Sequence, residues 1–377
     1  MGQTVVGVGD PKAVKKFSAF LAVDTPKKSY VTSRLMGKEG SSMPIQQVDR
    51  LENEAGDTVS YDLLMQMTMQ PREGDEVLEG HEQDMKFYSD EMHIEQMRGG
   101  VDTGGRMSRK RTLHELRKKA RRLQSDWWAR VFDELFFMYL CGARGINSDF
   151  VYPTTYTGFA GNGITAPDSE HLLFAGNKAK ATLLVTDVML LAEIDKAKTV
   201  AETMGGGAGG GSAGTDGNTQ TPQIQPIKID GELHYVCLMH PYQEYSVRTS
   251  AAAGQWLDIQ KAMATAVGNK SQIFRGGMGM YNNVVLQSHR NIIRFSDYGA
   301  GSNIAAARAL FLGEQAGAIA FGSPGTGLRF GWDEETRDVG NRVIIASRTI
   351  AGIKKTTYNG KDYGVMCIDT AAKAPNV

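Results

Sequence analysis

The sequence is poor in features that mark several common classes of protein. It contains only three cysteines, Cys141, Cys237 and Cys367, which are far apart and form no CxxC pair. This pattern argues against a disulfide framework or a cysteine-ligated metal, so we expect all three to be buried as small hydrophobic side chains. No apolar run approaches the ~20 residues of a membrane-spanning helix, and residues 1–10 do not resemble a secretion signal. We therefore predict a protein that is made and stays in the cytosol, with no membrane partner.

The chain also lacks net charge. Its 42 lysines and arginines balance 42 aspartates and glutamates, so the composition predicts no general affinity for nucleic acid or for an anionic membrane. Hydrophobic residues make up 41% and charged residues 22%, which is ordinary globular usage. The length of 377 residues allows about two to three domains. Any electrostatic function must then come from local separation of charge.

Three glycine-rich segments resemble enzyme motifs, and each lacks an essential part. Residues 210–214 match GxSxG, but they lie in a glycine-rich stretch rather than between a strand and a helix, so a hydrolase that uses Ser212 is a poor alternative. Residues 322–329 lack the Lys-Ser/Thr pair of a phosphate-binding loop. Residues 275–283 lack the third glycine of a dinucleotide fingerprint and predict a tight turn instead. The sequence therefore predicts no catalytic residue, no cofactor and no enzyme activity.

The histidines do not predict a metal site. None of them has the HxxxH, HExxH or paired-carboxylate spacing that a metal requires, so we expect ordinary surface or core roles. The seven residues are His81, His93, His114, His171, His234, His240 and His289.

The first part of the chain predicts extended elements rather than a compact domain. Residues 1–56 have little periodicity apart from a short helical pattern at 14–23, and predict an extended arm that needs a partner. Residues 57–70 and 85–97 have the composition and alternation of strands, and the segment between them is rich in glycine and acid. These two strands predict a long hairpin with a polar tip.

The strongest helical pattern covers residues 112–141. Thr112 and Glu115 have the spacing of a capping box, and Gly142 follows the last periodic residue. At 1.5 Å per residue the helix would be roughly 45 Å long. Its C-terminal half is the more apolar one, so we expect the last three turns to be deeply buried. The apolar stripe consists of Leu113, Leu116, Ala120, Leu123, Trp127, Val131 and Leu135, widened by Trp128, Phe132 and Phe136.

The remainder mixes helices with strands, so the predicted fold class is α+β. Helices are predicted at 186–203, near 255–267 and near 305–318, and a mobile surface loop at 205–217, where eight of thirteen residues are glycine. A projecting hairpin, a very long helix and an arm without its own core are typical of a subunit in an assembly. The predicted strands are 224–230, 232–240, 282–288, 291–298, 342–355 and 363–370.

Charge is separated along the chain. Residues 73–95 hold nine acidic side chains and one base, Lys86, whereas residues 106–122 hold nine bases. Each run has an ordinary explanation as a solvated face. The two together favour a contact in which the acidic hairpin of one copy lies over the basic helix of another. Nonspecific nucleic-acid binding by the basic run is the alternative, although no aromatic residues are interleaved with it. The candidate contact residues are Glu73, Asp75, Glu76, Glu79, Glu82, Arg109, Lys110, Arg111, Arg117, Lys118, Lys119, Arg121 and Arg122.

The order of arm, hairpin, long helix, mixed region and closing strands resembles the Hong Kong 97-type (HK97-like) fold of tailed-phage major capsid proteins. Particular segments are similar to the N4-like phage major capsid family. They are WARVFDELFFMYLCG (128–142), VCLMHPYQEYSVR (236–248), IFRGGMGMYNNVVL (273–286), ALFLGEQAGAIAFG (309–322) and GIKKTTYNGKDYGVMCIDTAA (352–372). The resemblance spans most of the chain but offers no counterpart for the glycine-rich insert at 205–217.

The resemblance implies a division of the chain into five parts. The spine helix (112–141) and the insert would belong to the peripheral domain, and the axial domain would meet its equivalents around five-fold and six-fold axes. The parts are an N-terminal arm (1–56), an extended β-hairpin loop (57–98), a peripheral domain (99–230), an axial domain (231–330) and return strands of the peripheral domain (331–377).

The resemblance also implies a function. Copies of the chain would assemble into hexamers and pentamers of an icosahedral shell that encloses the double-stranded DNA of a tailed bacteriophage. The shell would form in the host cytoplasm and remain in the virion capsid, with portal, scaffolding and decoration proteins as further partners. Packaged DNA would touch the inner face nonspecifically, and contacts between subunits would take the place of an active site.

Overall fold

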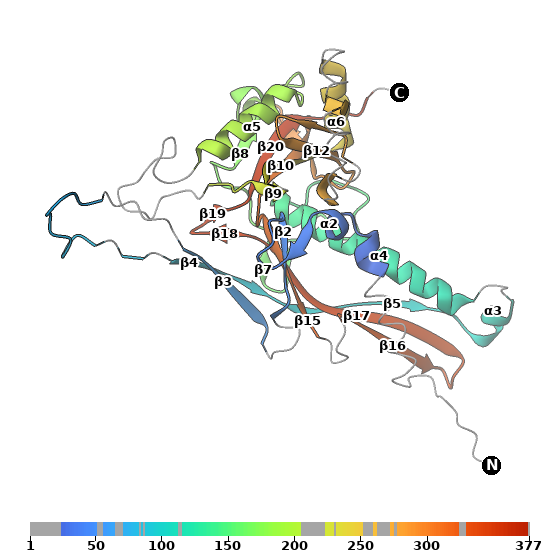
Figure 1. Ribbon diagram of the computed structural model, residues 1–377. Coiled ribbons are helices and arrows are strands. Elements are labelled where there is room, and N and C mark those ends of the chain that lie inside the picture. Colours follow the sequence, from blue (N-terminus) through green and yellow to red (C-terminus); the bar gives the residue numbers. More distant parts are fainter. Residues whose placement is uncertain are drawn as a thin grey trace.

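The computed structural model describes residues 24–50, 56–64, 71–82, 84–85, 87–111, 115–204, 223–229, 231–251, 259–261, 272–274, 277–323 and 329–375, without the side chains of residues 63, 64, 109, 117 and 272. Two β-sheets and a long helix form the body, and a hairpin projects from it (Figure 1). The predicted helix at 14–23 and the glycine-rich loop at 205–217 lie outside these residues, as does most of the helix predicted near 255–267.

The six-stranded sheet is organised around β17, a strand of 14 residues at Arg342–Lys355. β15 and β16 pair with consecutive parts of one edge of β17, and β5 pairs antiparallel with its other edge. β2 and β1 extend the sheet beyond β15 through parallel pairs. Segments that are far apart in the sequence therefore share one sheet. The strand bounds are β1 Met36–Lys38, β2 Ile45–Val48, β5 Glu95–Asp102, β15 Gly317–Gly322 and β16 Phe330–Arg337.

The eight-stranded sheet contains β14 (Ile304–Leu312), which pairs antiparallel with β10 and β20. Along β10, Val236 and Leu238 belong to the core around the long helix, whereas Tyr235 and Cys237 belong to a second core with helix α5. Both faces of the sheet are thus buried, which explains its nearly continuous apolar strands. The bounds are β8 Leu172–Phe174, β9 Ile227–Ile229, β10 Glu232–Met239, β11 Gly279–Tyr281, β12 Val284–Ser288, β13 Arg294–Tyr298, β20 Val365–Ala371 and α5 Leu191–Thr203.

The long helix α4 runs from Leu116 to Cys141, and its C-terminal half packs against strands of both sheets. Every side chain from Val131 to Cys141 is buried, which confirms the predicted burial of the last three turns. Gly142 ends the helix in the left-handed conformation at φ 67°, and a Cβ there would lie 2.3 Å from the carbonyl oxygen of Thr165. Shorter helical elements are α2 Tyr30–Arg34, α3 Arg106–Arg111, α6 Pro241–Ser250, η2 Ala175–Asn177, η3 Lys180–Thr182 and η4 Gln272–Phe274.

The predicted hairpin is present and projects from the body (Figure 1). β3 (Thr58–Leu64) pairs antiparallel with β4 (Phe87–His93) along its whole length. The second predicted strand, 85–97, serves two sheets, because Ile94 separates β4 from β5. Two further strand pairs are β6 Gly158–Phe159 with β7 Asn162–Gly163 and β18 Thr357–Tyr358 with β19 Lys361–Asp362.

The prediction of a helix at 305–318 is wrong. These residues form most of β14 and the start of β15, which belong to different sheets. Gln315, in the turn between the two strands, has a positive φ of 56°. β14 is buried on both faces, so its apolar residues form an uninterrupted run that does not alternate. Periodicity alone does not separate such a strand from a buried helix.

Smaller differences concern the ends of helices. α5 begins at Leu191 rather than at 186. The reason is that the Asp187 carboxylate accepts hydrogen bonds from the Leu184 amide and the Lys178 ammonium, and so holds a turn instead of a helix. The capping box predicted at the start of the long helix includes residues 112–114, which lie outside the description. Leu123, which was predicted to be in the buried stripe, is exposed.

Two strands cross the predicted domain boundaries. β15 precedes residue 330 but pairs in the sheet of β17, whereas β20 follows residue 331 but pairs in the sheet of β14. Residues 331–377 therefore do not return to one sheet as a unit. The physical reason is the antiparallel pairing of β20 with β14, which includes a buried ion pair between Arg308 and Asp369 at 2.7 Å.

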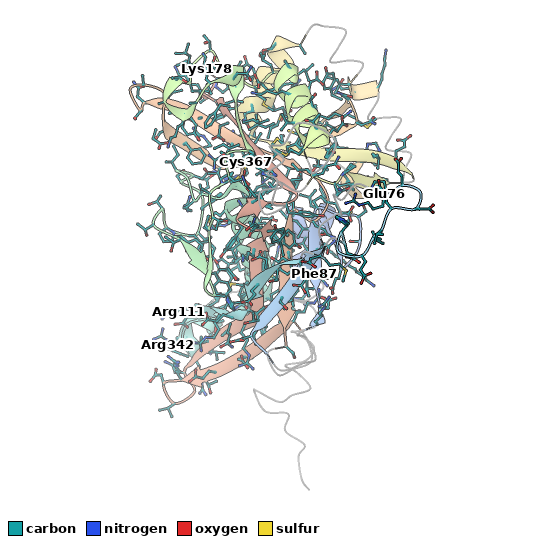
Figure 2. The ribbon with its side chains drawn as sticks, turned by 90° about the vertical axis from the view of Figure 1, so that its left-hand side faces the viewer. Glu76, Phe87, Arg111, Lys178, Arg342 and Cys367 are labelled. Carbon is teal, nitrogen blue, oxygen red and sulfur yellow. The ribbon has the colours of Figure 1, made fainter. Side chains whose placement is uncertain are left out.

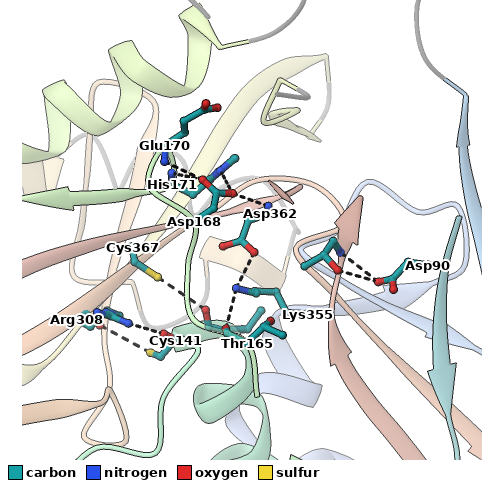
Figure 3. A network of polar contacts seen from close by, with 12 residues as sticks. Asp90, Cys141, Thr165, Asp168, Glu170, His171, Arg308, Lys355, Asp362 and Cys367 are labelled. Carbon is teal, nitrogen blue, oxygen red and sulfur yellow. Dashed lines mark hydrogen bonds and ion pairs between the residues drawn. The ribbon is translucent and has the colours of Figure 1, made fainter. Parts of the chain in front are cut away.

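Each of the two sheets carries a buried basic side chain near the end of α4, Arg308 in one and Lys355 in the other (Figure 3). Arg308 on β14 binds Asp369 on β20 and also donates to the carbonyl oxygen of Cys141 at 2.9 Å. At the end of β17, the buried Lys355 pairs with Asp362 at 2.7 Å. The three cysteines are free and buried, as predicted, and burial raises the pKa of the Cys141 thiol to about 12. These buried groups therefore stabilise the body of the molecule.

Candidate functional site

The acidic end of the molecule is the tip of the β3–β4 hairpin. Residues 71–82, 84 and 85 are exposed and project away from the body (Figure 1). Arg72 lies 3.4 Å from Glu76, and Glu82 accepts a hydrogen bond from the Gly80 amide at 2.7 Å. The tip therefore presents excess negative charge to its surroundings. Its exposed acidic side chains are Glu73, Asp75, Glu76, Glu79, Glu82 and Asp84.

The basic end comprises α3 and the first two turns of α4. Lys118 and Arg121 form ion pairs within the chain, at 2.5 and 2.9 Å. The side chains of Arg109 and Arg117 fall outside the description. The net positive charge of this end is therefore only partly balanced by its own chain. Besides Arg106, whose guanidinium donates to a backbone carbonyl oxygen, the exposed bases that make no ion pair with another described residue are Lys110, Arg111, Lys119 and Arg122.

The two charged ends lie on opposite sides of the molecule. Figure 1 places the hairpin loop at one extreme and α3 with the start of α4 at the other. The turned view in Figure 2 likewise separates Glu76 from Arg111. The structure thus gathers the predicted acidic residues at one end and the predicted basic residues at the other, but does not bring the two sets together within a chain. A contact between them requires two copies.

One carboxylate holds the base of the hairpin. Asp90 on β4 accepts hydrogen bonds from the Lys354 ammonium at 2.5 Å, from the Tyr61 hydroxyl at 3.0 Å and from the Thr357 hydroxyl at 3.2 Å. Burial, together with the nearby Asp90 carboxylate, raises the pKa of Tyr61 far above its usual value, so the hydroxyl keeps its proton and remains a donor. The hairpin is therefore tied to β17 and β18 near its base, and its direction is fixed before any partner binds.

The turn between β16 and β17 supports the basic end. The Arg106 amide donates to the Asn341 side chain at 3.0 Å, and the Arg106 guanidinium donates to the Gly340 carbonyl oxygen at 3.2 Å. Asp338, Val339 and Gly340 all have positive φ, at 54°, 48° and 83°. This conformation is unusual for a β-branched residue, and the Val339 side chain is fully exposed. The turn ties α3 to the six-stranded sheet.

The sequence did not predict a set of exposed apolar side chains at both ends. For the hairpin tip a signal was available, because apolar residues inside a charged loop have no local core to enter. For Leu123 no such signal was available, because its spacing fits the buried stripe of α4. The exposed fractions are 68% for Val77, 51% for Leu78 and 73% for Met85 at the tip, 59% for Phe87 at the start of β4, and 60% for Met107 and 59% for Leu123 at the basic end.

The described residues contain no cluster of three or more His, Cys, Asp or Glu side chains placed to hold a metal ion. Within the same residues, no helix has the length and apolar content needed to cross a membrane. A cleft of about 480 Å³ beside α4 is lined by Asp126, Asp133 and His289. Asp133 has a structural task there, because it accepts hydrogen bonds from the Ser29 hydroxyl and from the amides of residues 30 and 31 at 2.7–3.0 Å.

The glycine-rich motifs fall mostly outside the description. This holds for the GxSxG match at 210–214 and for residues 324–328 of the loop at 322–329. The tight turn predicted within 275–283 is confirmed where it is described, because Asn282 and Asn283 have positive φ and connect β11 to β12.

Known proteins resemble this chain over nearly its whole length. A family model described as phage capsid protein matches residues 5–374. The major capsid protein of Pseudomonas phage KPP25 is 23% identical over an alignment of 365 residues, and the match covers 89% of each chain. The solved capsid of Ralstonia phage GP4 is 50% identical, with a TM-score of 0.84 and full coverage of both chains. The capsid asymmetric unit of cyanophage Pam1 is 18% identical, with a TM-score of 0.69 over 92% of this chain and 93% of that chain, a likeness of fold alone.

Proposed function

The chain belongs to the phage capsid protein family, and from that premise we propose that its copies assemble into hexamers and pentamers which close an icosahedral shell around double-stranded DNA. The protein is a phage major capsid protein of the virion, with an HK97-like α+β fold, and it is not an enzyme. Membership of the N4-like family is a finer assignment, and the five similar segments support it.

The observation that carries the proposed assembly is the separation of charge between the two ends of one chain. The acidic hairpin tip of one copy would lie over the basic end of the next, where α3 and α4 begin. Such a contact is heterologous, so repeating it around an axis closes a ring. Complementary charge steers the encounter, and salt weakens it. The thirteen predicted contact residues would act through this interface.

The division of the chain is part of the same proposal. The six-stranded sheet with α4 would form the peripheral domain, and the eight-stranded sheet would form the axial domain, so β20 would belong to the axial side. The hairpin of β3 and β4 would be the extended loop. Packaged DNA would touch the inner face nonspecifically, and portal, scaffolding and decoration proteins would join the shell in the host cytoplasm.

The first test is to express the chain alone and to examine it by sedimentation and negative-stain electron microscopy. We expect closed shells or rings of subunits. Reversing the charge in Glu79→Lys or in Lys119→Glu should weaken assembly, and combining both substitutions in one chain should restore it. Glu232→Lys, on an exposed residue of β10, is the matched control. Equal assembly by all these variants would contradict the charge contact.

Nonspecific binding of nucleic acid is the second candidate, and the exposed bases Lys110, Arg111, Lys119 and Arg122 favour it. If these bases bind phosphates, the affinity of the unassembled chain for duplex DNA falls steeply with salt, and the slope counts the phosphates that are neutralised. Charge reversal at Arg111 should then reduce the slope by about one contact. Binding that is absent or insensitive to salt would remove this candidate.

A further inference from the structure

We propose that the contact between two copies has an apolar centre inside its charged rim. The centre is formed by the tip group, Val77, Leu78 and Met85 of one copy, and by the seat pair, Met107 and Leu123 of the next. This inference rests on the proposed self-assembly and adds what holds two subunits together after charge has brought them close.

The tip group is presented on a shaped loop. Hydrogen bonds from the Glu76 amide to the Glu73 carbonyl and from the His81 amide to the Leu78 carbonyl, at 3.3 and 3.0 Å, close two turns there. Gly74 and Gly80 have positive φ in the same segment. All three side chains of the tip group are at least half exposed. Scattered single apolar residues on a surface are normal, whereas several on one projecting loop mark an interaction site.

The seat pair lies among bases. Met107 is on α3 next to Arg106, and Leu123 is on α4 next to Arg122 and one turn after Lys119. Residues four apart share a helix face, so Lys119 borders the exposed Leu123 directly. Long basic side chains also have apolar stems that cover a neighbouring apolar group while the charge stays in water. Each member of the seat pair is therefore an exposed apolar side chain with basic neighbours.

A second copy of the chain is the occupant that fits both halves. Val77 and Leu78 lie between Glu76 and Glu79, so the tip has an apolar centre and a negative rim, and the seat has the same layout with a positive rim. Stable interfaces combine a desolvated apolar core with a polar rim in this way. Nucleic acid would match the basic rim but would leave the acidic tip and all five apolar side chains without a partner.

The direction of the hairpin makes the contact intermolecular. Asp90 ties the base of the hairpin to Lys354, and the tip then points away from the chain's own α3 and α4. Figure 2 shows Phe87 and Arg111 in different parts of the same molecule. Each copy thus offers a tip at one end and a seat at the other, so one chain cannot satisfy its own two sites.

The direct test uses a short thiol crosslinker. Chains that carry Leu78→Cys are mixed with chains that carry Leu123→Cys, assembled and treated with the reagent. The three native thiols are buried and do not compete. We expect a crosslinked pair of chains. The yield should be about ten-fold or more above that of a control in which Leu184→Cys replaces Leu123→Cys. Leu184 is similarly exposed and lies on the side of the eight-stranded sheet. A yield equal to the control would overturn the inference.

A second measurement separates the apolar centre from the charged rim. The double variant Val77→Ser with Leu78→Ser should raise the chain concentration needed for assembly about ten-fold or more, in low and in high salt alike. The control is Leu184→Ser with Val185→Ser, which should assemble as the wild type does. Normal assembly of the tip variant contradicts the inference alone, whereas a wild-type chain that stays monomeric contradicts the proposed assembly, and the inference with it.

Discussion

The two halves of helix α4 are built on the same backbone and follow different rules. From Val131 to Cys141 every side chain is buried, and Phe132 packs its ring near those of Trp128 and Phe330, at 5.9 and 6.3 Å between centroids. Near the start of the helix most side chains are exposed and basic, and even Leu123 faces outward. The buried half is explained by contacts within the chain. The exposed half has no such explanation among the described residues, and we propose that another copy covers it.

The largest effect should come from cutting into the buried half. Phe132→Ala removes a ring that contacts two strands of the six-stranded sheet through Phe321 and Phe330. Deleting such a side chain costs about 3–5 kcal/mol of unfolding free energy, because it loses burial and leaves a cavity. Urea unfolding of the unassembled chain in dilute solution measures this loss.

The matched substitution in the exposed half is Leu123→Ala. Its side chain contributes little to the monomer, so the change in unfolding free energy should stay within about 0.5 kcal/mol of zero. Assembly, in contrast, should weaken. If both substitutions destabilised the monomer equally, the two halves of α4 would not differ in the way the structure indicates.

The hairpin anchor should give the next largest effect. Asp90→Ala leaves the Lys354 ammonium and the Tyr61 hydroxyl without their shared acceptor. Hydrogen bonds to a charged group contribute about 1.5–3 kcal/mol, and we expect the loss to appear mainly as local opening of β3 and β4. Hydrogen exchange should quicken in residues 58–64 and 87–93 and remain slow in β14. Asp62→Ala, on the exposed side of β3, is the control. Unchanged exchange in the hairpin would show that Asp90 does not anchor it.

A further effect on stability should appear with pH, on the side of the eight-stranded sheet. Burial, and then the charges of Arg294 and Arg290 respectively, lower the pKa of His240 and of His289 from 6.5 to about 4. The Nδ1 atom of His240 accepts a hydrogen bond from the backbone amide of residue 242 at the start of α6, which requires the unprotonated nitrogen. Because the unfolded chain takes up these protons first, stability should be constant above pH ~6.5 and should fall as the pH drops towards ~4.

His240→Asn tests that prediction. Asparagine keeps an acceptor at the start of α6 but does not titrate, so the loss of stability between pH ~6.5 and ~4 should become shallower. Urea unfolding at several pH values measures the slope. The contribution of His289 should remain. An unchanged slope would mean that His240 is not responsible for any part of the pH dependence.

The sequence alone was sufficient to predict the structure where local pattern and burial agree. It predicted the hairpin, the buried end of α4 and the stop at Gly142, because alternation, a helical stripe and a left-handed glycine are local signals. It failed at 305–318, because a strand buried on both faces has no alternation to detect. At the candidate site it identified the charges, which composition reveals. It did not identify the exposure of Leu123, because exposure depends on which neighbours the tertiary structure supplies.

The smallest effect on the stability of the monomer should come from Lys119→Glu. This substitution also gives the sharpest test of the difference between the two halves of α4. A negative charge in the first turns of a helix is favoured by the helix dipole by about 0.3–1 kcal/mol, whereas a like charge four residues after Glu115 costs about 0.2–0.5 kcal/mol. The two terms nearly cancel, so the unfolding free energy of the monomer should hardly change.

Assembly of the Lys119→Glu chain at low salt should nevertheless weaken. Added salt should reduce the difference in assembly between the variant and the wild type, because salt screens the attraction in the wild-type contact and the repulsion in the variant contact. Lys198→Glu, on α5, is the control, since its charge lies outside the proposed contact. A Lys119→Glu chain that is folded, as stable as the wild type and unable to assemble would locate the defect between subunits; one that unfolds early would place Lys119 among the groups that support its own chain.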